Sequence, residues 1–295
     1  MKKRFLGVLL SVAMVAAVLA GCGSSGAKET AAPAGSETEA ASEAASGETE
    51  AAGNTGDVIT VGFSQVGAES DWRTANSESM KSTFSTENGY NLIFDDAQQK
   101  QENQIAAIRN FIQQEVDYIL LAPVTETGWD TVLQEAKDAE IPVIIVDRMV
   151  DVSDDSLYTA WVGSNFKLEG QKAMAWLDAY LEAKGRGDEE INLVDIQGTI
   201  GASAQIGRTE GFDEAVEAHD NWTTLAQQSG EFTQAKGQEV MESILKQSGD
   251  DIDVVYCEND NEAFGAIDAI KAAGYEVGGE EGQILVMSFD TTNAG

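Results

Sequence analysis

Polar and aromatic side chains recur directly after apolar runs that have the length of β-strands. Ser64 ends one such run, Asp96 follows a second, and the pair Asp147-Arg148 follows another. In open α/β sheets, ligands bind outside the carboxyl ends of the strands, so these positions are candidates for a binding site. Both halves of the chain contribute candidates, which are Ser64, Trp72, Arg73, Asp96, Asp147, Arg148, Arg208, Asn259 and Asp290.

These side chains suit the hydroxyl groups of a sugar. A hydroxyl both donates and accepts hydrogen bonds, so it can pair with a carboxylate and a guanidinium together. The indole of Trp72 could cover the apolar face of a sugar ring. Taken singly, Asp147-Arg148 could be an exposed ion pair, and Arg208 a solvated helix charge. Their joint placement at strand ends favours a polyol site.

Other chemistry finds little support in the residues. The chain has one histidine, His219, and two cysteines, Cys22 and Cys257, which leaves little for a zinc site or a Ser-His or Cys-His mechanism. Cys257 ends an apolar run and is predicted to be a buried, unreactive thiol. Two carboxylates in a cleft could hydrolyse glycosides, an alternative that the arginine-rich candidate set disfavours. We predict no enzyme activity, no metal and no cofactor.

The charge excludes another class of partner. The net charge is −33, with 51 acidic and 18 basic residues, and about −31 of it falls on residues 57–295. Nucleic-acid phosphates require Lys and Arg, so nucleic acid is not an expected partner. An acidic surface also disfavours lying on anionic lipid. The composition fits a soluble, exported domain.

The elements that would position the candidate residues follow a repeating pattern. Apolar strand-like runs alternate with helix-period segments, which is typical of a parallel sheet covered on both faces. The pattern is interrupted by an irregular acidic stretch at 149–157 and a short crossing strand at 158–162, and then restarts. The expected strands are 58–64, 90–94, 118–121, 143–147, 192–197, 223–228, 253–257 and 284–290; the expected helices are 71–87, 100–115, 128–139, 165–184, 202–218, 233–247 and 262–273.

This arrangement predicts an α/β protein with two doubly wound parallel-sheet lobes joined by a hinge. The N-terminal lobe is expected at 57–162 and the C-terminal lobe at 163–295. No closing helix follows the last expected strand, so we expect the second lobe to be C-terminally incomplete.

The N-terminal residues indicate export. Residues 1–22 combine a basic start, a short apolar run and small residues before a break, as in a secretory signal peptide. The break at Leu-Ala-Gly-Cys is typical of a bacterial lipobox, which predicts a lipid on Cys22. Residues 23–56 are rich in Gly, Ser, Ala and Glu and are expected to form a disordered acidic linker.

Several segments together resemble one family. They include VGFSQVG at 61–67, followed by Trp72 and Arg73, QQKQENQ at 98–104, QGTIGAS at 197–203 and QSGEFT at 228–233. This pattern resembles the type I periplasmic sugar-binding proteins of ABC transporters, most closely the galactofuranose-binding proteins. The resemblance extends over residues 58–290.

The resemblance implies two lobes that close on one monosaccharide and deliver it to an ABC permease and its ATPase. It implies that the candidate residues other than Ser64 contact the ligand. The expected protein is monomeric, extracytoplasmic (periplasmic where the cell has an outer membrane) and attached to the membrane only through Cys22. Asp71 and Glu258 depart from the usual pattern, which leaves the preferred sugar open. A sensor that presents its ligand to a chemoreceptor or histidine kinase is the alternative.

Overall fold

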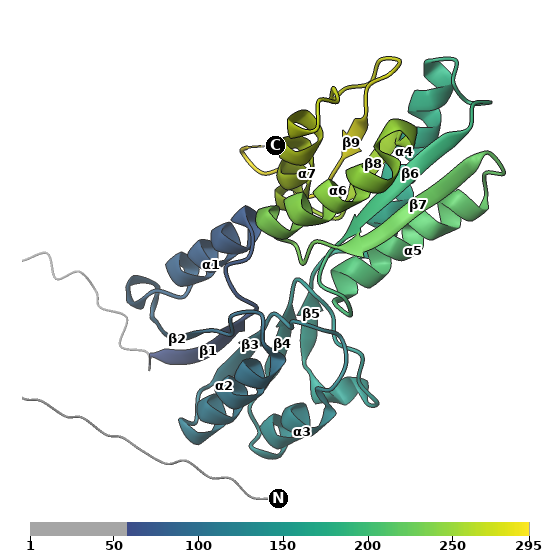
Figure 1. Ribbon diagram of the computed structural model, residues 1–295. Coiled ribbons are helices and arrows are strands. Elements are labelled where there is room, and N and C mark those ends of the chain that lie inside the picture. Colours follow the sequence, from purple (N-terminus) through teal and green to yellow (C-terminus); the bar gives the residue numbers. More distant parts are fainter. Residues whose placement is uncertain (1–57, 295) are drawn as a thin grey trace, which may run out of the picture. The chain divides into compact units, whose positions relative to one another are not determined.

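The computed structural model describes residues 58–294, in which strands and helices alternate along the chain (Figure 1). The expected signal peptide at 1–22, the linker at 23–56 and the lipid on Cys22 lie outside the described residues. Within residues 58–294, no helix has the length and apolar character needed to cross a membrane.

The first sheet has five parallel strands in the order β2-β1-β3-β4-β5. Alternate residues of β3 pack on opposite faces, with Ile119 and Leu121 in one apolar cluster and Leu120 in another. Both faces of this sheet are therefore covered. Its elements are β1 (Ile59–Gln65), α1 (Asp71–Thr83), β2 (Tyr90–Asp96), α2 (Gln101–Gln113), β3 (Tyr118–Leu121), α3 (Asp130–Asp138), β4 (Val143–Val146) and β5 (Ala160–Val162).

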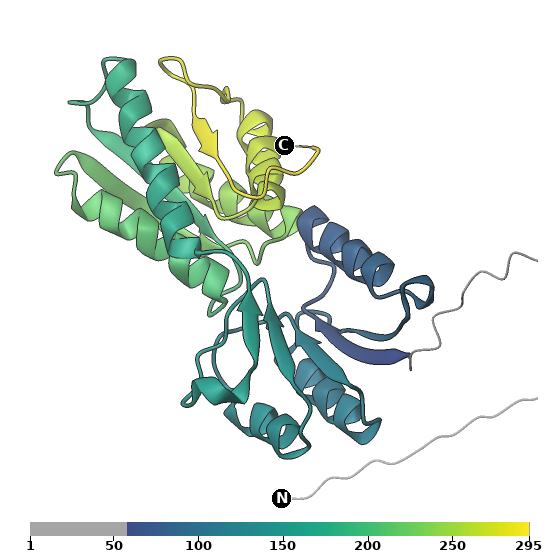
Figure 2. The same cartoon turned by 180° about the vertical axis from the view of Figure 1, so that it is seen from behind.

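The second sheet has four parallel strands in the order β7-β6-β8-β9. In β8, Val255 and Cys257 join one apolar cluster, and Val254 and Tyr256 join another on the opposite face. Helix α4 packs beside α5, and α6 beside α7 (Figures 1 and 2). The elements are α4 (Phe166–Ala183), β6 (Ile191–Gln197), α5 (Ser203–Glu217), β7 (Trp222–Ser229), α6 (Gln234–Ser248), β8 (Val254–Cys257), α7 (Asp260–Ala272) and β9 (Leu285–Met287).

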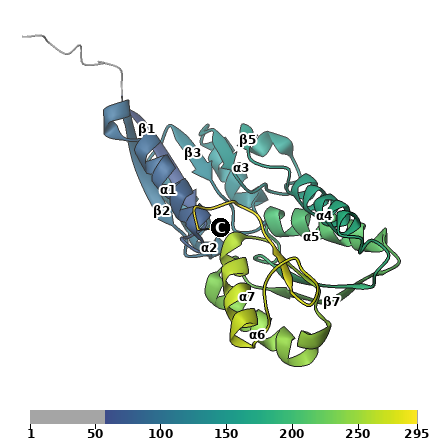
Figure 3. The ribbon, with the colours of Figure 1, turned by 90° about the horizontal axis from the view of Figure 1, so that it is seen from above.

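The predicted α/β class with two parallel sheets is confirmed. The exact lobe boundary at residues 162 and 163 stays a prediction. A hydrogen bond joins a helix of the first lobe to a helix of the second, because the Asp71 N–H at the start of α1 donates to the side-chain Oδ1 of Asn261 in α7 at 3.0 Å. The start of α1 therefore lies beside the start of α7 (Figure 3).

Two predicted boundaries were wrong at positions that matter for the site. Helix α7 begins at Asp260 rather than 262, because the Asn259 side chain accepts the Glu262 N–H at 2.8 Å and caps the helix. Strand β9 ends at Met287 rather than 290. Asp290 has a positive φ of 88°, a backbone conformation that a strand does not contain.

Candidate ligand-binding site

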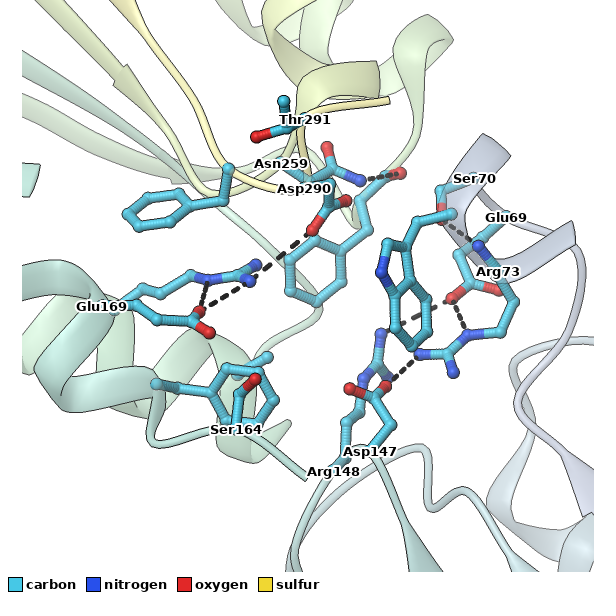
Figure 4. Close-up of a pocket in the computed structure, with 16 residues that line it drawn as sticks. Glu69, Ser70, Arg73, Asp147, Arg148, Ser164, Glu169, Asn259, Asp290 and Thr291 are labelled. Atoms are coloured by element: carbon cyan, nitrogen blue, oxygen red, sulfur yellow. Dashed lines mark hydrogen bonds and ion pairs between the residues drawn. The ribbon is translucent and has the colours of Figure 1, made fainter. Parts of the chain in front are cut away.

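A cavity of about 280 Å³ lies at the carboxyl-terminal ends of strands from both sheets (Figure 4). This is the edge at which the sequence predicted a site. Seven of the nine candidate residues line the cavity, namely Trp72, Arg73, Asp147, Arg148, Arg208, Asn259 and Asp290.

Arg73 and Arg148 form one charged wall of the cavity, and each is only 3% exposed. Arg73 Nε donates to Glu69 Oε1 at 3.1 Å, and Arg73 Nη2 donates to Asp147 Oδ2 at 2.8 Å. The same Glu69 oxygen lies 3.5 Å from Arg148 Nη2. Two guanidiniums thus share one carboxylate, and Figure 4 shows Arg73 between Glu69 and Asp147.

The start of α1 explains why Trp72 and Arg73 reach the cavity. Ser70 is the N-cap, and its Oγ accepts the Arg73 N–H at 3.1 Å. The first helical turn therefore begins at the cavity wall. The guanidinium of Arg73 also lies 4.8 Å from the centre of the Trp72 ring, a cation–π distance.

Arg208 forms the second charged group, on α5. Its Nη2 lies 3.0 Å from Glu169 Oε2 and 3.6 Å from Asp290 Oδ1. Figure 4 shows the ion pairs of Glu169 and Asp290 meeting at one guanidinium. The guanidinium also lies 4.5 Å from the ring centre of Phe289. Arg208 is thereby held in one orientation by charge and by stacking.

Burial shifts the acidity of two residues in the cavity. Burial, and then repulsion from Arg73, lowers the pKa of Arg148 to about 10, so Arg148 stays charged at neutral pH. Burial raises the pKa of Asp290 to about 6, although attraction to Arg208 opposes this shift. Asp290 is mainly ionised at neutral pH and gains a proton as the pH falls through about 6.

Phe232 and Asn259 complete the wall contributed by the second sheet. Asn259 Nδ2 donates to the Phe232 carbonyl at 3.0 Å, and the Phe232 ring lies 4.9 Å from the Arg148 guanidinium. The ring packs directly against Gly198, where a Cβ would overlap it. Gly198 is therefore required for Phe232 to stay in place.

Replacing Gly198 by alanine should weaken ligand binding, because the added methyl group would push Phe232 away from Arg148. Overpacking of this kind costs roughly 1–3 kcal/mol of stability. Ligand affinity and urea unfolding measured on the same variant would check this. Wild-type values for both would show that the Phe232 ring has room to move.

Two candidate residues do not reach the cavity. Ser64 is fully buried within β1, where its carbonyl accepts the Ala122 N–H at 3.0 Å. Asp96 is exposed, and its Oδ1 accepts the Gln98 N–H at 2.8 Å in the turn after β2. Strand-end position alone does not bring a side chain to the site, since successive side chains point to opposite faces. Their positions do not support the expected ligand contacts.

Several residues that line the cavity were missed by the sequence reasoning. Glu69 could have been noticed, since it stands four residues before Arg73 in a capped helix start. Phe232 has a positive φ of 60°, which no local pattern indicated. The main missed residues are Glu69, Ser164, Phe166, Glu169, Phe232 and Phe289.

Within residues 58–294, no group of three or more His, Cys, Asp or Glu side chains is arranged to hold a metal ion. Cys257 is buried, as predicted from its apolar run. Burial, together with nearby Glu262 and Asp195, raises the pKa of this thiol well above its usual value. A thiol of this kind is mainly protonated and a poor nucleophile.

Comparison with known proteins places this geometry among sugar-binding proteins. The chain is 48% identical over 234 residues to the galactofuranose-binding protein YtfQ of Escherichia coli, covering 79% of this chain and 71% of that protein. A Mycobacterium smegmatis protein in complex with β-D-fucofuranose is 45% identical, with a TM-score of 0.75, covering 80% and 75% of the two chains. The binding component of an arabinose ABC transporter from Shewanella sp. ANA-3, bound to α- and β-L-arabinofuranose, is 47% identical, with a TM-score of 0.73, covering 79% and 74%.

A family model described as the periplasmic binding protein domain matches residues 61–295. The structural neighbours share the two-sheet fold over most of their length, which confirms the predicted periplasmic binding protein fold. The chain therefore belongs to the periplasmic binding protein family.

Proposed function

We propose that the chain captures one neutral monosaccharide in its furanose form and delivers it to an ABC importer. As a member of its family, the chain binds a solute and is not an enzyme. The observation that carries the proposal is the set of paired charges around the cavity, in which each of three guanidiniums already has a carboxylate partner.

The charge balance favours a neutral ligand with many hydroxyls. Three arginines face four carboxylates, so a ligand carboxylate or phosphate would meet repulsion as well as attraction. Glu69 Oε2, Arg73 Nη1 and Arg148 Nε are buried and have no partner among the described residues. Hydroxyl groups, which both donate and accept hydrogen bonds, suit a cavity wall that carries guanidiniums and carboxylates side by side.

The size and the aromatic lining of the cavity fit a single sugar ring. At about 280 Å³ it lies just below the range of roughly 300–1,000 Å³ typical of drug-sized ligands. Trp72, Phe166 and Phe289 line it and can pack against the C–H groups of a sugar. The ring form is suggested by the three similar proteins, whose names specify galactofuranose, fucofuranose and arabinofuranose.

The cellular setting follows from the N-terminal sequence and from the relatives. We propose a lipid on Cys22 and an acidic linker at 23–56 that tether a monomeric, extracytoplasmic receptor to the membrane. The two α/β lobes would close about a hinge near residues 158–163, and no bond is made or broken. The naming of the Shewanella protein as a component of an arabinose ABC transporter supports an importer as the partner.

Calorimetric titration with a panel of sugars tests the proposal. D-galactose, D-fucose and L-arabinose equilibrate with furanose forms in water, and D-galacturonate adds a negative charge to the galactose skeleton. We expect one-to-one binding of at least one neutral sugar, with a dissociation constant of roughly micromolar or below, and much weaker binding of galacturonate. Absence of heat with every neutral sugar, or equally tight binding of galacturonate, would contradict the proposal.

A further inference from the structure

Glu69 occupies an unusual place for a carboxylate. Its side chain lines the cavity and yet is only 1% exposed. Among the ion pairs within residues 58–294, it is the carboxylate that contacts both Arg73 and Arg148, since Asp147 lies within ion-pair distance of Arg73 only. One buried anion therefore stands between two buried cations (Figure 4).

The two arginines would repel each other without this anion. Arg73 and Arg148 are both buried, and attraction to the Glu69 carboxylate stabilises the charged form of each guanidinium. The other charges that act on Arg148 are Asp147, which attracts it, and Arg208, which repels it. Removing one partner of a buried ion pair leaves an uncompensated charge, which is strongly unfavourable.

The local backbone holds Glu69 at this position. It directly precedes the N-cap Ser70, so its side chain reaches Arg73 over one helical turn. Gly67 provides the space, because a Cβ at that position would lie 3.2 Å from Glu69 Oε2. The position of Glu69 directly before the N-cap thus directs its carboxylate toward Arg73, and Gly67 leaves room for that carboxylate.

We propose that Glu69 is a positioning residue of the pocket, whose carboxylate holds the Arg73 and Arg148 guanidiniums side by side so that both can donate to one ligand. The inference rests on the proposed function, because the ligand is taken to be a neutral sugar. Glu69 acts through the two arginines, and its contribution to affinity depends on their presence.

The test compares Glu69→Gln with Glu78→Gln, a matched change at an exposed position of α1, the helix that begins just after Glu69. The probe is the tightest-binding neutral sugar of the calorimetric panel. We expect Glu69→Gln to bind roughly 10- to 100-fold more weakly with an unchanged circular dichroism spectrum, and Glu78→Gln to bind as the wild type does. Wild-type affinity in Glu69→Gln would overturn the proposal.

A double-mutant cycle separates positioning from a general loss of structure. If Glu69 acts through Arg73, Glu69→Gln should have a much smaller effect in an Arg73→Gln background than in the wild type. Independent effects, in which the two losses of affinity multiply, would overturn the proposal. Should Glu69→Gln fail to fold, Glu69→Asp takes its place in the cycle, because it keeps the charge and shortens the reach.

A measurement without ligand keeps this inference separate from the proposed function. In 1H–15N spectra, the Arg73 Nε–H should exchange slowly in the wild type because it donates to Glu69, and quickly in Glu69→Gln. An unchanged signal would overturn the positioning role. Failure of the wild type to bind any sugar, with this signal behaving as expected, would contradict the proposed function alone.

Discussion

Replacing Arg148 by alanine should lower sugar affinity at least 100-fold while the fold is retained. Arg148 is buried at the end of β4, and its Nε has no partner among the described residues. Each charge-assisted hydrogen bond contributes about 1.5–3 kcal/mol, and a guanidinium can make two of them to a sugar. The change also leaves Glu69 with a single guanidinium partner, Arg73, so the remaining donors lose their arrangement.

Calorimetry and circular dichroism on the same preparation check this expectation. Asp96→Asn is the control, because Asp96 is the last residue of β2 in the same sheet and yet lies outside the cavity. The control should bind sugar as tightly as the wild type. Retained affinity in Arg148→Ala would assign this arginine a structural role only.

The stability of the protein should fall as the pH rises from about 5 to about 9, and Glu258→Gln should remove much of this fall. Glu258 directly follows β8 and is fully buried, and burial raises its pKa from 4.5 to about 8. Its two oxygens accept the Gly198 N–H at 2.7 Å and the Thr209 hydroxyl at 2.6 Å, which only partly offsets that shift.

The sign follows from proton counting. Between pH 4.5 and 8 the folded state holds a proton on Glu258 that the unfolded state has lost, so raising the pH favours unfolding. One pKa unit corresponds to 1.36 kcal/mol. We therefore expect the unfolding free energy of Glu258→Gln to fall between pH 5 and pH 9 by about 2–4 kcal/mol less than that of the wild type. Burial also raises the pKa values of Asp195 and Glu262. These two groups account for the dependence of unfolding free energy on pH that remains in Glu258→Gln.

Urea unfolding at pH 5, 7 and 9 measures this effect. Glu78→Gln, at an exposed position of α1, serves as the control for loss of one negative charge and should keep the wild-type slope. An identical slope in Glu258→Gln and the wild type would mean that Glu258 is ionised throughout this range.

The sequence predicted the location of the pocket because parallel strands share one carboxyl edge. Asp147, Arg208 and Asp290 come from distant parts of the chain and still meet at the cavity. Asp147 and Asp290 follow strands, and Arg208 lies in the second turn of a helix that starts at that edge. This argument uses only the order of elements, so it needs no knowledge of side-chain orientation. It failed for Ser64 and Asp96, where orientation decides which side chain enters the cavity.

The partners of the arginines could not be predicted in the same way. Glu169 meets Arg208 because α4 packs beside α5, and helix packing between separate elements is not encoded in local spacing. Glu258 stood out in the sequence as a departure from the family pattern, but its full burial depends on β8 lying inside the second sheet. These features arise from tertiary packing, which periodicity alone does not specify.

The ring form of the bound sugar tests the central claim most directly. The tightest-binding neutral sugar of the panel, labelled with 13C at C1, gives separate resonances for its furanose and pyranose forms, and exchange between them in water supplies either form to the protein. The account predicts that the wild-type chain binds one equivalent whose C1 resonance is that of a furanose, and that Arg148→Ala binds none. A bound pyranose, or a furanose bound equally well by Arg148→Ala, would contradict it.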